Sequence, residues 1–430
     1  MKGVRIPRKL LYLLGGVAGL LLAAVIAALL VLPSAWFREK VRARIVYEVE
    51  RASGGRVEVG SFQFDWTSMV AEISPFVLHG TEGPGQAPLF AADSVRVGIT
   101  VVSMLRRDID IASVEINRPR VNLIIDRSGI TNLPRPKLQR ATARDPIETL
   151  LRLAIGEMRL RNGELQYGDT RIALDLHGRE LNAKLAYNLN GPAYQGDISM
   201  RQVTAATGPT LPMTFDFSGR VALYRNRIQI VAGHVGMRET ALDFSGSVEG
   251  FQAPQMAFEL SGVADLAEIG KPLRIPLEHT GRAAFKGRLL YERVSGLRID
   301  GRLTGQHLAF RRGVVRLENI STAADVNFTR DRVQLRDLTV HALDGVFRGL
   351  ASIDNLKTFQ LNGRLTGVAV RSLARMTGNE RFGFGGTLNG PVEAKGAFQT
   401  FRELLARGQF QVLATQGGVP VRGRLEASWN

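Results

Sequence analysis

The first part of the chain is patterned for a membrane-spanning helix. Residues Leu10 to Leu32 form an uncharged apolar segment. At about 1.5 Å per residue this segment covers about 34 Å as a helix, enough to cross a hydrocarbon core of about 30 Å. The pattern predicts a transmembrane helix, with an aromatic residue at its outer end. The anchoring residues are Leu10, Leu14, Leu20, Leu22, Ile26, Leu30, Leu32 and Trp36.

The alternative for this segment is a cleaved signal peptide, whose apolar part is usually shorter, about 7–15 residues. The flank before the segment holds Lys2, Arg5, Arg8 and Lys9 and no acid. Basic residues also follow the segment, beside Glu39, so the positive-inside counts are nearly equal. The purely basic first flank favours a cytoplasmic N-terminus, with the body of the chain on the other side.

A helical period follows the span. Phe37, Val41, Ile45 and Val49 recur every four residues, and Ser53-Gly54-Gly55 is a typical helix stop. The sequence therefore predicts a short amphipathic helix. Its apolar stripe has two candidate partners, the membrane surface and the first β-sheet.

From Gly55 onward the apolar period changes to two, which is the period of β-strands. Val57 and Val59 share one parity and Phe62, Phe64 and Trp66 the other, so we expect a bulge at Gly60-Ser61. Further strands are expected at Val70–His79, Ser94–Val102, Ile109–Ile116 and Arg120–Ile125, with a turn at Ser128-Gly129.

The later part of the chain repeats one sequence pattern, in which apolar and polar residues alternate and glycine stands inside the strand or at its end. GRLTG occurs at Gly301–Gly305 and Gly363–Gly367, and DFSG at Asp216–Gly219 and Asp243–Gly246. These matches indicate a sheet of similar strands. The alternation predicts a shared apolar face that includes Phe215, Phe217, Val221, Leu223, Met256, Phe258, Leu260, Phe359, Leu361 and Leu365.

Helical signal in this region is limited to Leu266–Ile269, Val370–Met376 and Phe401–Arg407. Such short helices do not cover one face of so many strands, so the apolar face needs another partner. A two-sheet sandwich, a closed barrel or a sheet folded into a trough each provides one. The pattern alone favours the sandwich, in which the ten apolar residues are plain core; in a trough they line a groove for lipid.

The predicted organisation has four parts. Residues 1–35 form a basic flank and the anchor, and residues 36–135 the amphipathic helix with a first β region. A Pro-rich, basic linker and a short helix occupy 136–156. Residues 157–430 form a repetitive β-groove region, and the chain is a candidate for either a short protein of this kind or the front piece of a longer one.

Composition narrows the chemistry. The net charge is +16, which suits anionic lipid surfaces, but no nucleic-acid recognition motif or long basic run is present. The absence of cysteine excludes disulfides and thiolate metal sites. The six histidines form no HExxH motif, and no GxSxG or phosphate-binding loop is present. We therefore expect no enzyme activity, metal or cofactor.

The opening of the chain resembles the AsmA-like superfamily, and within it the N-terminal portion of TamB-type proteins. The resemblance rests on GGRVEVGSFQFDW at Gly54–Trp66, on the strand series from Leu89 to Leu133, and on EMRLRNGELQYGD at Glu157–Asp169. The family signature is matched by Arg118, Pro119, Asp126, Gly129, Asn132 and Leu133.

The resemblance implies an elongated, antiparallel-rich sheet folded into a trough, anchored in the bacterial inner membrane with its bulk in the periplasm. It implies a role in cell-envelope biogenesis, in which phospholipid or a similar lipid is shielded and transferred toward the outer membrane. It also implies an alternative, a factor for assembly or secretion of proteins that acts with an outer-membrane barrel partner.

Overall fold

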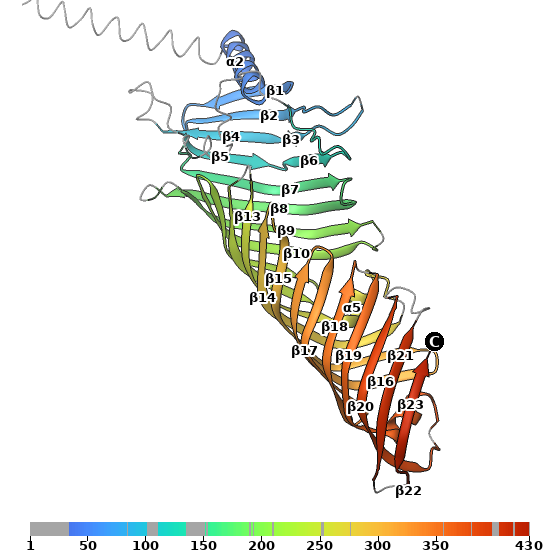
Figure 1. Cartoon of the computed structure of the whole chain (residues 1–430). Helices are drawn as coiled ribbons and strands as arrows, with labels where there is room; N and C mark the ends of the chain where they lie inside the picture. Colours follow the sequence, from blue (N-terminus) through green and yellow to red (C-terminus); the bar gives the residue numbers. More distant parts are fainter. Residues whose placement is uncertain are drawn as a thin grey trace, which may run out of the picture. The chain divides into compact units, whose positions relative to one another are not determined.

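The structure is a computed structural model, and it is mainly β (Figure 1). It describes residues 34–83, 85–100, 111–134, 151, 154–188, 191, 193–208, 210–250, 253–275, 277–355, 357–379, 381–397, 404–415 and 418–429. Hydrogen bonding joins the described strands into one long sheet in which antiparallel pairs predominate. The mainly β, antiparallel-rich expectation is confirmed. The chain divides into two units, residues 1–143 with 155–163 and residues 144–154 with 164–430.

The first unit consists of one helix and a small sheet. Strand β2 lies between β1 on one side and β3 and β4 on the other, β4 pairs with β5, and β3 with β6. The pair β5–β7 is parallel. The elements are α2 (Ala35–Ser53), β1 (Val57–Asp65), β2 (Val70–Leu78), β3 (Phe90–Ala92), β4 (Ser94–Ile99), β5 (Ile111–Asn117), β6 (Arg120–Ile125) and the first half of β7 (Glu157–Asp169).

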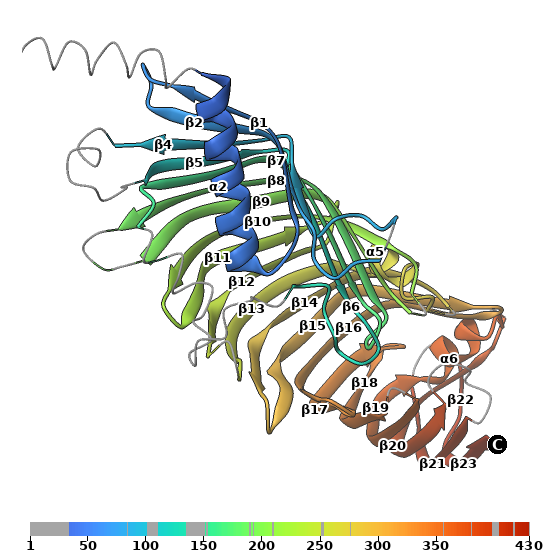
Figure 2. The ribbon, with the colours of Figure 1, turned by 90° about the horizontal axis from the view of Figure 1, so that it is seen from above.

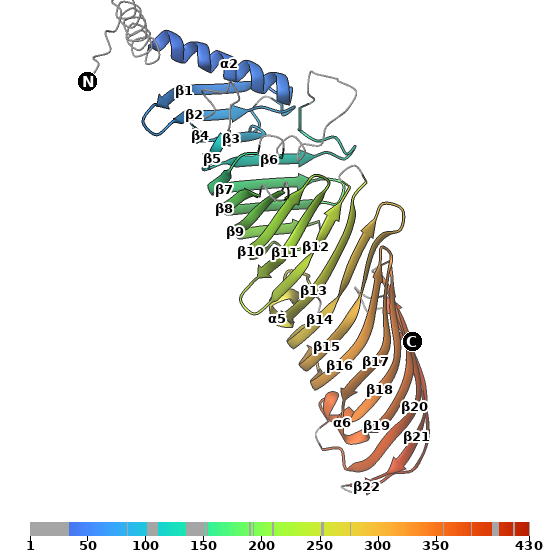
Figure 3. The same cartoon turned by 90° about the vertical axis from the view of Figure 1, so that its left-hand side faces the viewer.

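Helix α2 lies beside β1, as Figures 1 and 3 show. Its apolar stripe, with Val41, Ile45 and Val49, packs on a cluster that includes Val57 and Phe62 of β1. The helix ends where expected, because Gly54 has a φ of +79°. The sequence left two candidate partners for this stripe, the membrane surface and the first β-sheet. In the structure the stripe packs on the sheet.

The expected bulge at Gly60-Ser61 is wrong. Val59 pairs with Phe76 and Ser61 with Ser74, so the register of β1 and β2 is unbroken there. Val59 and Phe62 nevertheless belong to the same cluster, although they differ in parity. Both strands therefore change face together, and no residue is inserted.

The second unit contains the long antiparallel part of the sheet. Its strands are the second half of β7, β8 (Leu174–Asn188), β9 (Ala193–Thr207), β10 (Met213–Tyr224), β11 (Arg227–Gly236), β12 (Ala241–Glu249), β13 (Gln255–Asp265), β14 (Glu278–Glu292), β15 (Gly296–Arg312), β16 (Val315–Thr329), β17 (Arg332–Ala342), β18 (Gly345–Asp354), β19 (Thr358–Ala369), β20 (Phe384–Ala397), β21 (Leu405–Ala414), β22 (Val419–Pro420) and β23 (Gly423–Trp429).

Each strand from β8 to β21 pairs with the next strand along the chain, and β23 pairs with β21. A sandwich divides its strands between two sheets, so this single ladder differs from the sandwich that the pattern alone favours. Short α5 (Leu266–Gly270) and α6 (Val370–Met376) stand where two of the three helical signals predicted them.

The third helical prediction, Phe401–Arg407, is wrong in its described part. Leu405 to Arg407 open β21, where Leu405 pairs with Lys395 and Arg407 with Glu393. The alternation of apolar and polar residues in LARGQFQV outweighs the weak helical pattern before it.

Many strands of the second unit are interrupted by β-bulges. The register shifts within the pairs β8–β9, β9–β10, β15–β16 and β17–β18, among others. Residues in left-handed conformation stand at such shifts: Glu180, Gln202, His307 and Asp337. The carboxylate of Asp216 accepts a hydrogen bond of 2.9 Å from the backbone N–H of Gln202. Bulges bend strands, and Figure 2 shows bent strands through this unit.

The predicted membrane span, Leu10 to Leu32, and most of the predicted linker lie outside the described residues. Within the part of the chain that is described, no helix combines the length and the apolar character needed to cross a membrane.

Candidate functional site: the apolar face of the second unit

The pairing of the strands β12 to β20 places apolar and polar residues in two neighbouring cross-strand rows. One cross-strand row consists of apolar residues and glycine, and we call it the apolar row. Through direct partners it runs across Gly246, Phe258, Leu289, Ile299, Phe328, Val333, Ile353, Phe359 and Gly396. A row shifted by one residue is polar throughout: Ser245, Glu259, Arg288, Asp300, Asn327, Gln334, Ser352, Gln360 and Lys395.

The apolar row belongs to a wider surface that we call the apolar face. A second row beside it runs across Phe244, Leu260, Gly287, Gly301, Val326, Leu335, Ala351, Leu361 and Ala394. Every large side chain of the apolar row, from Phe258 to Phe359, is partly buried and none is fully buried. A sheet face packed inside a sandwich is expected to bury such residues almost completely.

The structure brings together predicted groove residues that lie far apart in sequence. Phe258 and Phe359 share the apolar row, and Leu260 and Leu361 share the row beside it. Met256 pairs with Tyr291 at the margin of the same face.

Four predicted groove residues lie on β10. Phe217 pairs with Val235 and Met200, and Phe215 with Val203. The others, Val221 and Leu223, pair with Ile230 and Ile228 on β11. Val221 is buried and the other three are partly buried.

Phe244 of β12 was missed from the sequence, although it stands in one of the two DFSG segments. Its ring lies between two predicted groove residues, with centroids 6.5 Å from Phe217 and 6.1 Å from Phe258. The three rings form an aromatic row across β10, β12 and β13. The repeated DFSG motif was the signal that could have identified Phe244, because Phe217 occupies the same place in the other copy.

Two small cores stand at the far part of the face. Leu361 and the last predicted groove residue, Leu365, pack against a cluster of Ala324, Leu338 and Phe347. Leu365 also contacts a second cluster, Val368, Leu388 and Val412. Here neighbouring strands bury each other's side chains, and the predicted residues take part in a core.

The GRLTG segments occupy equivalent places in two hairpins. In β14–β15, Phe285 pairs with Leu303 and Gly287 with Gly301. In β18–β19, Phe347 pairs with Leu365 and Gly349 with Gly363, each 62 positions later. The short sequence match therefore marks a structural repeat with identical register.

The opposite face of the sheet is charged and paired. Arginines and acids on neighbouring strands meet as Arg302–Asp325 at 2.7 Å, Arg288–Glu259 at 2.5 Å and Arg332–Asp354 at 2.5 Å. The side chain of Arg298 donates a hydrogen bond to Asp300, and this lowers the pKa of that carboxyl. Exposed pairs of this kind contribute little to stability, but they mark this face as solvated.

One surface hollow of this unit includes two residues of the apolar row, Gly246 and Phe258, and another does not. A hollow of about 860 Å³ lies between the end of β17 and α6, lined by His341, Asp344, Ser372 and Arg375 among others. A hollow of about 430 Å³ is lined by the exposed side chains of Val231, Ala257, Glu259, Arg288 and Leu290 together with Phe258.

One arrangement of catalytic residue types was also missed from the sequence. Ser218 pairs with His234, and His234 pairs with Asp243, on three neighbouring strands. His234 Nδ1 lies 2.7 Å from a carboxylate oxygen of Asp243. His234 is 49% exposed, and no hydrogen bond from Ser218 to its ring is found among the described residues. Nucleophilic catalysis requires that bond, so the arrangement amounts to a surface hydrogen bond between His234 and Asp243.

The described residues contain no cluster of three or more metal-ligating side chains.

The residues of the family signature form a folded turn in the first unit. One carboxylate oxygen of Asp126 accepts hydrogen bonds from the backbone N–H of Ser128 at 2.8 Å and of Ile130 at 2.9 Å. Its pKa is lowered, chiefly by the hydrogen bond from the Ser128 hydroxyl. Gly129 has a φ of +85°, which a residue with a side chain rarely adopts.

Asn132 and Pro119 of the signature are buried. The Asn132 side chain donates to the carbonyl of Asn122 at 2.7 Å and accepts from the Ile124 N–H at 3.0 Å. Arg118 forms an ion pair with Asp93, and Leu133 is exposed. These contacts connect strands and close a turn, which is a structural role.

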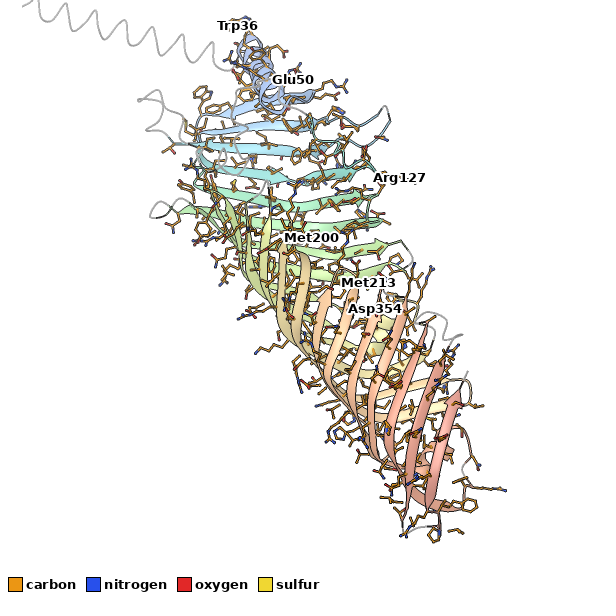
Figure 4. All side chains as sticks on the ribbon, in the orientation of Figure 1. Trp36, Glu50, Arg127, Met200, Met213 and Asp354 are labelled. Atoms are coloured by element: carbon orange, nitrogen blue, oxygen red, sulfur yellow. The ribbon has the colours of Figure 1, made fainter. Side chains whose placement is uncertain are left out.

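Of the predicted anchoring residues, Trp36 lies in the first turn of α2 (Figure 4) and is 64% exposed. The others, Leu10, Leu14, Leu20, Leu22, Ile26, Leu30 and Leu32, lie outside the described residues.

No model of a protein family, no curated protein and no solved structure matches this chain.

Proposed function

We propose that this protein is an inner-membrane-anchored periplasmic carrier that shields phospholipid, or a similar acyl-chain lipid, on its way toward the outer membrane. The observation that carries the proposal is the apolar row, which crosses nine strands without a polar residue and stays partly exposed. An acyl chain lying on such a row would remove its own methylene groups and the side chains from water, at about 0.8 kcal/mol per methylene group. No covalent chemistry and no cofactor is needed.

We infer that the sheet of the second unit is a trough with the apolar face inside. Two observations support this. Bulges recur in strand after strand, and each adds bend and twist. The paired arginines and acids lie on the face opposite to the apolar row, which suits an outer, solvated surface.

The proposed anchor is the apolar segment Leu10 to Leu32, which ends just before α2. The exposed Trp36 at the start of α2 suits a position at the membrane interface. The resemblance to TamB-type proteins supports the same location and direction. The lipid would enter from the inner membrane, to which the first unit is attached.

The test is lipid occupancy of the full chain, purified in mild detergent and analysed by native mass spectrometry. Phe258→Asp and Leu361→Asp place a carboxylate on the apolar face. Ala257→Asp and Gln360→Asp place the same charge one residue away, at exposed positions of the same strands. We expect the wild type and both controls to carry lipid, and the apolar-face variants to lose it while keeping their circular dichroism spectrum.

A folded wild-type chain without lipid would overturn the carrier. So would unfolding of every apolar-face variant, because the face would then be an ordinary core.

The resemblance supports a second candidate function, assistance of protein assembly or secretion with an outer-membrane barrel as partner. In that case a strand of the sheet would pair with a strand of the client protein. Cysteine crosslinks from exposed strand positions to such a client would support this function, and their absence would remove it.

A further inference from the structure

Phenylalanine rings on the apolar face lie flat over glycines. A methyl group placed on Gly233 would lie 2.5, 2.6 and 2.9 Å from three ring atoms of Phe244, which are its nearest neighbours. Gly233 and Phe244 are direct cross-strand partners on β11 and β12. The ring therefore occupies the space in which a side chain at position 233 would stand.

The same arrangement recurs along the face. Methyl groups on Gly287 and Gly301 would lie 2.7 and 2.6 Å from Cζ of Phe285. In the repeated hairpin, methyl groups on Gly349 and Gly363 would lie 2.8 and 2.5 Å from Cζ of Phe347. Each of these two rings covers a pair of glycines that face each other across two strands.

A further ring, Phe410 of β21, is the nearest neighbour of the space above Gly408. These glycines have ordinary extended backbone, since none of them is among the residues with positive φ. Their common property is therefore the absence of a side chain. A ring occupies the space left, together with a backbone carbonyl of the neighbouring strand at Gly287, Gly301, Gly349 and Gly363.

We infer that these glycines set the depth of the apolar face, so that flat rings leave room above the sheet for an acyl chain. Gly233, Gly287, Gly301, Gly349, Gly363 and Gly408 are thus specificity-determining residues of the carrier, acting through the rings that they hold down. The inference rests on the proposed function. A ring lifted by a methyl group beneath it would stand in the space that the lipid needs, and would narrow the groove at that strand.

Gly233 is the best position for a test, because the atoms nearest to an added methyl group all belong to the Phe244 ring. At Gly287 or Gly349 the methyl group would also meet a backbone carbonyl of the next strand, and a loss of folding would confuse the result. Phe244→Leu offers a rescue, since leucine lacks the outer ring atoms that collide.

The experiment uses the full chain in vesicles of phosphatidylethanolamine and phosphatidylglycerol that contain a phospholipid with a photoactivatable acyl chain. Crosslinked lipid is measured for wild type, Gly233→Ala, Phe244→Leu and the double variant. We expect the yield of crosslinked lipid for Gly233→Ala to be about tenfold lower than for wild type. This loss is comparable to that of two buried methylene groups. The double variant should recover the yield of Phe244→Leu alone, because without the outer ring atoms the added methyl group has nothing to lift. Thermal unfolding should be similar for all four.

Equal crosslinking of wild type and Gly233→Ala would overturn this inference and leave the carrier standing. Failure of Phe244→Leu to restore the yield would also overturn it, because the ring would not be the obstacle. No crosslinking in the wild type would reject the carrier itself, and with it the inference.

Discussion

Two neighbouring leucines of β14 provide the sharpest test of the two-faced sheet. Leu289 belongs to the apolar row and has Phe258 and Ile299 as direct partners. Leu290 is 44% exposed on the other face, opposite Ala257 and Arg298. The substitutions Leu289→Asp and Leu290→Asp make the same chemical change one residue apart.

The expected losses of unfolding free energy differ several-fold between the two variants. Full burial of a leucine stabilises by about 1.5–3 kcal/mol, and Leu289 is partly buried, so its removal costs about 1–2 kcal/mol. A carboxylate among Phe258 and Ile299 adds about 1–3 kcal/mol for a polar group without a partner. Leu290→Asp should change stability by no more than about 0.5 kcal/mol. Its carboxylate would face Arg298, a favourable cross-strand pair.

The assay is urea unfolding of the full chain in one detergent, followed by circular dichroism. We expect Leu289→Asp to lower the unfolding free energy by about 2–5 kcal/mol relative to Leu290→Asp. Equal losses for the two variants would refute the reasoning, because both faces would then be equally buried. A larger loss for Leu290→Asp would reverse the assignment of the faces.

Other expectations concern the first unit and the end of β7. Ile45→Asp should detach α2 from the sheet and expose it to limited proteolysis, whereas Tyr47→Asp, at a 53% exposed position, should not. Asn132→Ala should cost about 1–3 kcal/mol in urea unfolding, because it leaves the Asn122 carbonyl and Ile124 amide without this partner. Hydrogen bonds from Arg171 hold the pKa of Asp169 at about 2, below 3.8, so Asp169 stabilises the fold above pH 3.8. That contribution should be lost as the pH falls from 3.8 through about 2. The substitution Arg171→Gln should raise the pKa of Asp169, which an NMR titration would measure.

The sequence was sufficient for features that depend on neighbours along the chain. The alternation in TFDFSGRVALY placed Phe215 and Phe217 on one side of β10, and the structure pairs both with apolar residues of β9. The helical segments Leu266–Ile269 and Val370–Met376 were identified with correct starts. Local period and local helix signals decide these features.

Features that depend on register could not be read in advance. Phe258 and Phe359 share a row only because of the register of every strand pair between them. Each hairpin sets that register, and each bulge shifts it. Phe244 alternates with polar residues, in the same parity as Leu242 and Val248, so the side of the strand on which it stands could have been predicted. The ring contacts with Phe217 and Phe258 arise across strands, where one sequence without register gives no signal.

Glycine connects the composition to the apolar face. In the sequence, glycine recurs inside the predicted strands or at their ends. In the structure, Gly246 lies in the apolar row itself and Gly262 faces Phe285 across two strands, positions where a side chain would meet the neighbouring strand or its large residues. In the hairpins β14–β15 and β18–β19, paired glycines lie beside this row of large side chains, and a phenylalanine ring lies over each pair. The two hairpins with GRLTG repeat this arrangement at the same register, 62 positions apart, so the ring over paired glycines is a recurrent feature of the apolar face.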